Sequence, residues 1–192
     1  LNSFFAFCER HDFRVKFIKT QKQLFSRDEK ELTKAEYLRL LDAAKRYYCG
    51  DFYQLISHYY ETLSTVVERT GCQIVGHFDL VSKFNEDNSI FHDEDPRAFL
   101  PAVDALDMLL KKDVLFEINT GAMARGYRKN PYPSLDILKK LCTCGAKLLL
   151  TSDCHDAVNL DFGFEEVLSS EVGKLASENL IKNIAEMPFI KK

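Results

Sequence analysis

Short apolar runs alternate with longer amphipathic stretches along this chain of 192 residues. Four of the runs are compact and lack a strict alternation of polar and apolar positions. That pattern is typical of parallel strands that are covered on both faces of a sheet. The predicted strands are at residues 14–18, 73–78, 114–119 and 147–151.

Five stretches between and after these runs have the apolar spacing or the terminal residues of helices. One of them has an apolar stripe that starts at Phe52, and Gly71 is placed to end it. Another begins with Asp95 as an N-cap and Pro96 at the first helical position. The predicted helices are at residues 31–48, 51–70, 95–112, 134–144 and 172–185.

The alternation of strands and helices predicts an α/β fold with a parallel sheet and right-handed crossovers. No linker and no low-complexity segment divides the sequence, so we expect a single domain over residues 1–192. The pattern by itself fits either an open doubly wound sheet or a (β/α) barrel. Both architectures place their chemistry at the C-terminal ends of the strands.

Composition narrows the class of protein. A net charge of −3 gives no basic surface for nucleic acid, and no apolar run is long enough to span a membrane. The six cysteines accompany neither a secretory leader nor a CxxC spacing. We therefore expect buried, reduced thiols in a cytoplasmic protein.

Polar residues that can bind metal stand where three successive predicted strands end. His77 follows the second strand, Glu117 and Asn119 end the third, and Asp153 and His155 follow the fourth. Imidazole and carboxylate groups are preferred ligands of zinc, iron and manganese. A single histidine of this kind is more often structural, but Asp and His at consecutive strand ends predict a shared site of His77, Asp153 and His155.

Two arginines follow the third strand in a segment that also contains glycine. The guanidinium groups of Arg125 and Arg128 could bind phosphate or carboxylate, because the guanidinium fork matches the oxygens of those groups. The alternative is a solvated loop with two surface arginines.

Taken together, these motifs resemble the histidinol-phosphatases of the polymerase-and-histidinol-phosphatase (PHP) superfamily. The resemblance extends from about Glu31 to the end of the chain. Its segments are residues 50–53 (GDFY), 59–61 (YYE), 76–85 (GHFDLVSKFN), 117–122 (EINTGA), 125–128 (RGYR), 131–134 (PYPS) and 152–155 (SDCH).

The resemblance implies a distorted, TIM-like (β/α)7 barrel that hydrolyses L-histidinol phosphate, a small phosphorylated substrate, in histidine biosynthesis. It also implies a cluster of up to three divalent metal ions, either zinc, manganese or iron. The implied metal ligands are His77, Asp153 and His155, of which Asp153 and His155 are also candidate catalytic residues. The implied substrate-binding residues are Asn119, Arg125 and Arg128.

The sequence also departs from the family pattern. It contains no His-x-His motif, and residues 17–21 lack the histidine that the family has on a further strand. We therefore expect a barrel that is incomplete at its N-terminus and binds fewer than three metal ions. Three explanations stay open: a part of a longer protein, a decayed site, or ligands from elsewhere. An incomplete barrel would expose a sheet edge, so we expect a homo-oligomer.

The leading hypothesis is thus a metal-dependent phosphomonoester hydrolase. The alternative is a degenerate, non-catalytic PHP domain that binds a ligand or a partner. A third hypothesis is a domain like the proofreading exonuclease of a polymerase. The acidic net charge argues against a DNA substrate, and residues 117–133 resemble the branch of the superfamily that acts on small molecules.

Overall fold

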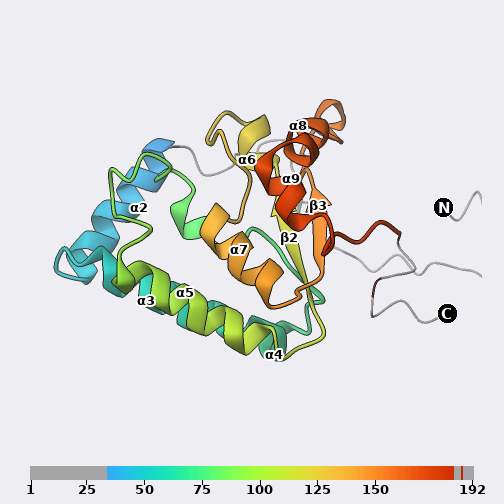
Figure 1. Cartoon of the computed structure of the whole chain (residues 1–192). Helices are drawn as coiled ribbons and strands as arrows, with labels where there is room; N and C mark the ends of the chain where they lie inside the picture. The colour runs from blue at the N-terminus through green and yellow to red at the C-terminus, as the bar shows by residue number, and fades with distance from the viewer. Residues whose placement is uncertain (1–33, 184–186, 188–192) are drawn as a thin grey trace, which may run out of the picture. The chain divides into compact units, whose positions relative to one another are not determined.

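The computed structural model describes residues 34–183 and residue 187 (Figure 1). The chain divides into two units, Leu1–Arg39 and Leu40–Lys192, and residues 34–39 are the described part of the first. The first described helix, α2, occupies Lys34–Tyr47. The predicted strand at residues 14–18 lies outside the described residues.

A small parallel sheet positions the strand ends. It consists of β1 (Ile74–Val75), β2 (Leu115–Asn119) and β3 (Leu148–Thr151), in the order β1-β2-β3. Asn119 pairs with Thr151, and both strand pairs are parallel. Three predicted strands and their parallel arrangement are therefore confirmed. Closure into a (β/α)7 barrel stays a prediction.

The first of these strands is shorter than predicted. Residues 73–78 were expected to be extended, but only Ile74 and Val75 pair with β2. The chain leaves the extended conformation at His77, whose φ is 29°. This early turn brings the histidine close to the end of the neighbouring strand.

The helix predicted at residues 51–70 is two helices, α3 (Phe52–Ser64) and α4 (Val66–Thr70). The interruption is at Thr65, whose hydroxyl donates a hydrogen bond to the carbonyl oxygen of Thr62 at 2.9 Å. Side chains that bond back to the preceding turn compete with the backbone pattern of a continuous helix. Gly71 ends α4 in the left-handed conformation, as its position predicts.

Two other helices begin where their terminal residues predict. The N-cap Asp95 accepts a hydrogen bond from the backbone N–H of Arg97 at 2.9 Å, and α5 follows at Pro96–Leu109. Helix α7 (Leu135–Thr143) follows Ser134 and is followed by Gly145, which has a φ of 71°.

The last predicted helix, at residues 172–185, is wrong in extent. Helix α9 covers only Glu171–Ala176. Beyond it, Leu148 on β3 donates a backbone hydrogen bond to Asn179 and accepts one from Ile181, each at 2.9 Å. This pairing with the sheet replaces the helix. Two short helices were not predicted, α6 (Gly121–Ala124) and α8 (Phe164–Ser169).

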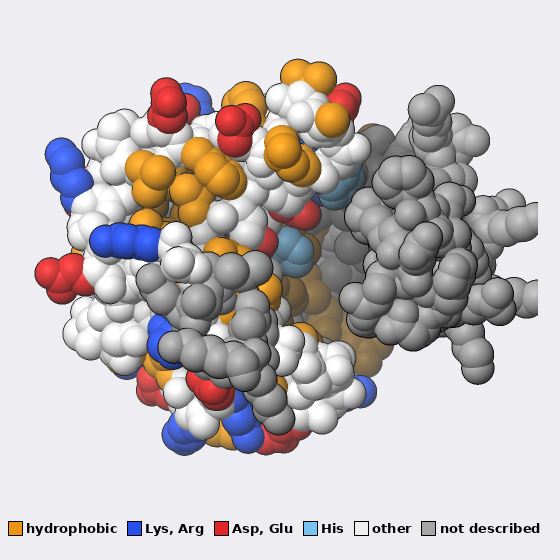
Figure 2. All heavy atoms as spheres, turned by 90° about the vertical axis from the view of Figure 1, so that its right-hand side faces the viewer, with side chains coloured by type: hydrophobic (Ala, Val, Ile, Leu, Met, Phe, Trp, Pro, Cys, Tyr) orange, Lys and Arg blue, Asp and Glu red, His pale blue; other side chains and the backbone are white. Residues whose placement is uncertain are grey.

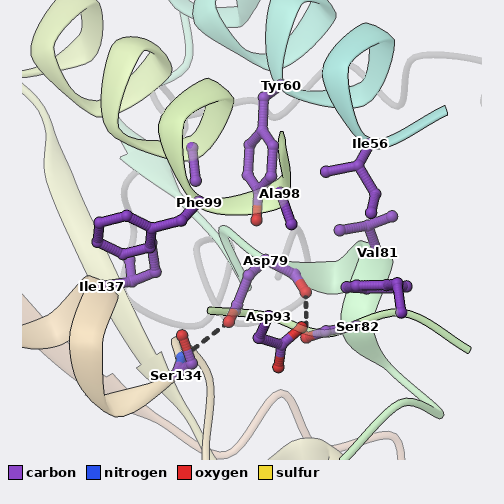
Figure 3. A pocket seen from close by; sticks show the side chains of 12 residues that line it. Ile56, Tyr60, Asp79, Val81, Ser82, Asp93, Ala98, Phe99, Ser134 and Ile137 are labelled. Atoms are coloured by element: carbon purple, nitrogen blue, oxygen red, sulfur yellow. Dashed lines mark hydrogen bonds between the residues drawn. The ribbon is translucent and has the colours of Figure 1, made fainter. Parts of the chain in front are cut away.

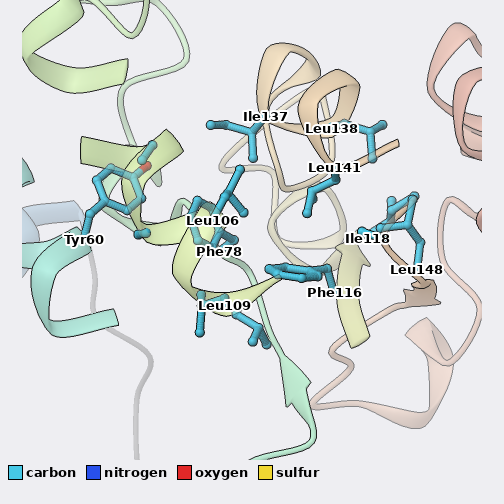
Figure 4. Close-up of a cluster of buried hydrophobic side chains, with 14 of the residues drawn as sticks. Tyr60, Phe78, Leu106, Leu109, Phe116, Ile118, Ile137, Leu138, Leu141 and Leu148 are labelled. Carbon is cyan, nitrogen blue, oxygen red and sulfur yellow. The ribbon is translucent and has the colours of Figure 1, made fainter. Parts of the chain in front are cut away.

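The apolar core lies between β2 and the helices α3, α5 and α7 (Figures 1 and 4). Phe116 of β2 stacks edge-on against Phe78 at a centroid distance of 6.2 Å. Leu106 and Leu109 of α5 are fully buried. Burying one such side chain contributes about 1.5–3 kcal/mol. The core therefore fixes β2, from whose end the polar site begins.

The five cysteines in the described part of the chain form no disulfide with one another, and none of them is fully buried. Cys49 and Cys144 are exposed, while Cys72, Cys142 and Cys154 are half-buried. The expectation of buried thiols is therefore wrong for these five cysteines. Among the helices of residues 34–183, none has the length and apolar character needed to cross a membrane.

Candidate functional site at the C-terminal edge of the sheet

The carboxylate of Glu117, on β2, connects the ends of all three strands. Its Oε2 accepts hydrogen bonds from the backbone N–H of His77 and from Nδ2 of Asn119, both at 2.8 Å. Its Oε1 accepts a hydrogen bond from the hydroxyl of Thr151, at the end of β3. Hydrogen bonds to an ionised carboxylate are stronger than neutral ones. Glu117 thus holds the three strand ends in a fixed relation.

Gly76 makes this arrangement possible because it has no side chain. A Cβ atom at this position would lie 3.0 Å from Oε2 of Glu117. That separation is tighter than nine in ten real Cβ contacts, so with a larger residue the carboxylate would have to shift by a few tenths of an ångström. The glycine therefore leaves space for Oε2 of Glu117, which accepts the hydrogen bond from the backbone N–H of His77.

Two predicted metal ligands have strained backbones. His77 has a φ of 29° and Asp153 a φ of 44°, and neither is a glycine. A non-glycine residue in this region costs about 1–3 kcal/mol and persists only where its surroundings hold it there. Such residues cluster at functional sites, and each of these two stands two positions beyond the last residue of a strand.

Arg125, which follows α6, contacts the predicted ligand Asp153. Its Nη1 donates to the backbone oxygen of Asp153 at 3.0 Å, and its Nη2 lies 3.3 Å from Oδ2. Gly121 leaves room for this pair, because a Cβ there would approach Arg125 Nη2 to 2.7 Å. The fold therefore brings together an arginine and an aspartate that are 28 positions apart.

His155 lies beside the same aspartate. Its Nε2 is 3.9 Å from Oδ1 of Asp153, and its side chain is 61% exposed, against 35% for Asp153. Figure 2 shows histidine side chains close to acidic ones on this face of the molecule. Two predicted ligands are thus adjacent and accessible to solvent.

The third predicted ligand is not gathered with them into one group. Within the described residues, no three His, Cys, Asp or Glu side chains are placed so that they could hold a metal ion. His77 is half-buried, and its backbone is tied to Glu117. A site that joins His77 to Asp153 and His155 therefore stays a prediction.

The other two predicted substrate-binding residues are buried. Nδ2 of Asn119 donates a hydrogen bond to Glu117, and Oδ1 of Asn119 accepts one from the backbone N–H of Gly121 at 2.8 Å. Arg128 is 8% exposed and donates from Nη1 to Ser82 Oγ at 2.8 Å. Of the two arginines, the fold therefore brings Arg125 to Asp153. That Asn119, Arg125 and Arg128 bind substrate stays a prediction.

Arg128 belongs to a second polar cluster, which lies inside the protein around Asp79. Oδ2 of Asp79 accepts the backbone N–H of Ser134 at 2.7 Å. Burial raises the pKa of Asp79, and the nearby guanidinium of Arg128 offsets this only in part. Burial also raises the pKa of Asp93, and the charge of Asp79 adds to that rise.

Sequence reasoning missed the roles of Glu117 and Asp79. Glu117 was expected only as one of two residues able to bind metal at its strand end, and Asp79 only as part of a family motif. The available signal was a carboxylate within an apolar run. Glu117 stands between Phe116 and Ile118, and Asp79 stands between Phe78 and Leu80.

Comparison with known proteins finds a distant similarity over part of the chain. No model of a known protein family matches the chain. A protein from Schizosaccharomyces pombe (strain 972 / ATCC 24843), named "Probable histidinol-phosphatase", is 28% identical over 110 residues. The match covers 53% of this chain and 33% of that protein. Part of the chain is thus distantly similar to a protein named as a phosphatase.

Proposed function

We propose that this chain carries part of the active site of a metal-dependent phosphomonoester hydrolase of the PHP type. One observation carries the proposal. His77, Glu117 and Asp153 stand at the ends of three parallel strands, on one edge of the sheet. The guanidinium of Arg125 contacts the carboxylate of Asp153 there. The distant similarity to a protein named as a probable histidinol-phosphatase supports the same class of reaction.

The donor chemistry at this edge fits a divalent zinc, manganese or iron ion. Asp153 offers a carboxylate oxygen and His155 an imidazole nitrogen, which are 3.9 Å apart. These two residues would hold the ion, and His77 would be the third ligand from this chain. A bound ion would supply an activated water and neutralise charge on the phosphoryl oxygens.

The chain's own residues would do the rest of the binding. Arg125 would bind oxygens of the substrate phosphate, because its guanidinium can form two parallel hydrogen bonds. Its present contact with Asp153 places it next to the proposed ion-binding residues. Glu117 would keep His77 in its strained conformation, and the exposed ring of His155 could move a proton at the surface.

We further propose L-histidinol phosphate as the substrate, and hence a role in histidine biosynthesis. This step rests on the family resemblance of residues 117–133 and on the name of the relative. Phosphate monoesters hydrolyse extremely slowly without a catalyst, so even a weak activity of the purified chain would be measurable above background.

The test is phosphate release from L-histidinol phosphate by the purified chain with Mn²⁺, Zn²⁺ or Fe²⁺. His77→Ala and Asp153→Ala should each lower the rate by at least about 100-fold, because they remove metal ligands. Binding of Mn²⁺ measured by calorimetry should weaken in parallel. His58→Ala is the matched control, since His58 is exposed on α3 and contacts Tyr48. This control should keep both activity and metal binding.

If the folded chain binds Mn²⁺ but releases no phosphate, the catalytic proposal fails. The non-catalytic PHP domain is then the better hypothesis. If the chain neither binds metal nor releases phosphate, the metal-dependent proposal fails as a whole.

A further inference from the structure

We propose that the small cavity beside Asp79 binds one monovalent cation of the size of water, either potassium or ammonium. The cavity lies between α3, α5, the start of α7 and the short 3-10 helix η1 (Leu80–Ser82), and Figure 3 shows it from close by. Its volume is about 20 Å³. A single water-sized guest needs about 10–15 Å³. The cavity is lined by none of the strand-end residues proposed for phosphatase chemistry, and Asp79 is two positions from His77.

The strongest evidence is an unsatisfied oxygen. Oδ1 of Asp79 is buried and has no hydrogen-bond partner among the residues that the structure describes. Oδ2 of the same carboxylate is satisfied by the backbone N–H of Ser134. A buried carboxylate oxygen without a partner is costly, because burial has removed its water. A guest in the adjoining cavity would remove that cost.

The polar groups around the cavity are oxygens. In Figure 3, the hydroxyl of Tyr60 points towards Asp79 from α3, and the carboxylate of Asp93 lies on the opposite side. Ser82 also lines the cavity, and its Oγ accepts a hydrogen bond from Arg128. Carboxylate and hydroxyl oxygens are hard ligands, which suit alkali and alkaline-earth cations rather than soft metals.

Charge favours a cation over a neutral water molecule. The cluster has two carboxylates, Asp79 and Asp93, but Arg128 is the cation that acts on both of them. That arginine is 8% exposed, stacks on the ring of Tyr132 at 4.5 Å and binds Ser82. Water would satisfy the oxygen of Asp79 but would not add to the single positive charge of Arg128. A cation would satisfy both the oxygen and the charge.

Size and hydration select a monovalent ion. Magnesium usually keeps several of its own waters, and a cavity of about 20 Å³ has no room for them. Potassium and ammonium are close to water in size. Asp93 and Ser134 also line a wider cleft of about 510 Å³ at the side of the cavity.

The test compares the thermal unfolding of the full chain in KCl, NH4Cl and choline chloride at equal ionic strength. Above Kd the Tm should rise with the logarithm of the KCl or NH4Cl concentration, and at a tenfold excess over Kd it should be about 3–6 °C higher than in choline chloride. Asp79→Asn should lose this difference between the salts. Asp113→Asn, which removes an exposed carboxylate in the same way, should keep it.

Equal Tm values in the three salts would overturn the proposal, and so would a salt response that persists in Asp79→Asn. A second measurement does not depend on whether that variant folds. Crystals of the unaltered chain grown with thallium(I), a heavy mimic of potassium, should show an anomalous peak next to Oδ1 of Asp79. A water peak there without anomalous signal would mean that the cavity holds water only. Neither readout depends on phosphatase activity.

Discussion

Two polar clusters in this protein use carboxylates in opposite ways. At the strand ends, the single carboxylate of Glu117 receives donors from all three strands. In the interior, Asp79 leaves Oδ1 without a partner among the described residues and shares the guanidinium of Arg128 with Asp93. In the first cluster, both carboxylate oxygens have hydrogen-bond donors. In the second, Oδ1 of Asp79 and Nε of Arg128 are both buried without a hydrogen-bond partner among the described residues.

This difference indicates what each cluster needs from outside the protein. A satisfied network stiffens the elements that it joins, whereas a partly satisfied one costs stability until a guest completes it. The strand-end cluster should therefore hold its geometry without a ligand. The interior cluster should depend on the composition of the solution. The variants described next test that contrast.

The largest effect is expected for Glu117→Ala. The substitution leaves three donors without their acceptor: the backbone N–H of His77, Nδ2 of Asn119 and the hydroxyl of Thr151. Each unsatisfied donor costs about 1–3 kcal/mol, so we expect the free energy of unfolding to fall by about 4 kcal/mol. Urea denaturation followed by circular dichroism measures this loss.

Glu117→Gln is the matched variant, because it keeps the shape and one acceptor oxygen but removes the charge. It should cost less than half as much as the alanine substitution. If the alanine variant loses less than about 1 kcal/mol, Glu117 does not hold the strand ends together, and the contrast between the clusters fails.

The next largest effect is expected for Arg128→Met. The methionine keeps most of the apolar length but removes the charge that faces Asp79 and Asp93. Removing one partner from a buried charged group costs about 3–5 kcal/mol, and we expect the lower end of that range because Asp93 is only half-buried. The same denaturation experiment measures the change.

Arg97→Met is its control, since the ion pair of Arg97 with Asp95 lies on the surface. That variant should change stability little. Equal losses for the two arginine variants would mean that the buried position of Arg128 has no special importance.

The sequence predicted the parts of this fold that depend on local pattern. The three described strands and the starts of α5 and α7 follow from apolar runs, Asp95 and Ser134. The end of α9 could not be found in this way, because it depends on the pairing of Leu180 with Leu148 far away in the sequence. Helices α6 and α8 are too short to show a helical period.

The candidate site at the strand ends was likewise predictable only where it depends on local sequence pattern. The residue types at the strand ends could be predicted, since parallel strands end at one edge. Which residues bind one another could not. Arg125 and Arg128 are three positions apart and chemically identical, yet the first contacts Asp153 and the second is buried against Ser82. Only the tertiary structure separates them.

The smallest effect tests the interior cluster through pH. Burial and the charge of Asp79 raise the pKa of Asp93 in the folded protein, and Arg128 lowers it in part. A carboxyl whose pKa is higher in the folded than in the unfolded chain binds its proton more tightly when folded. Its contribution to stability is therefore fully present below the unfolded pKa of about 3.9 and is lost as the pH rises through the folded pKa.

Asp93→Asn removes this loss, because an amide does not titrate. In choline buffer free of potassium and ammonium, the unfolding free energy of the unaltered chain should decline relative to that of the variant as the pH rises from about 4 to 7. The same substitution at the exposed Asp113 controls for the loss of a carboxylate. If the curves for Asp93→Asn and the unaltered chain run parallel, ionisation of Asp93 does not destabilise the folded protein, and the prediction is wrong. Adding potassium should reduce the difference between the two curves, since a bound cation would stabilise the ionised carboxylates of the interior cluster.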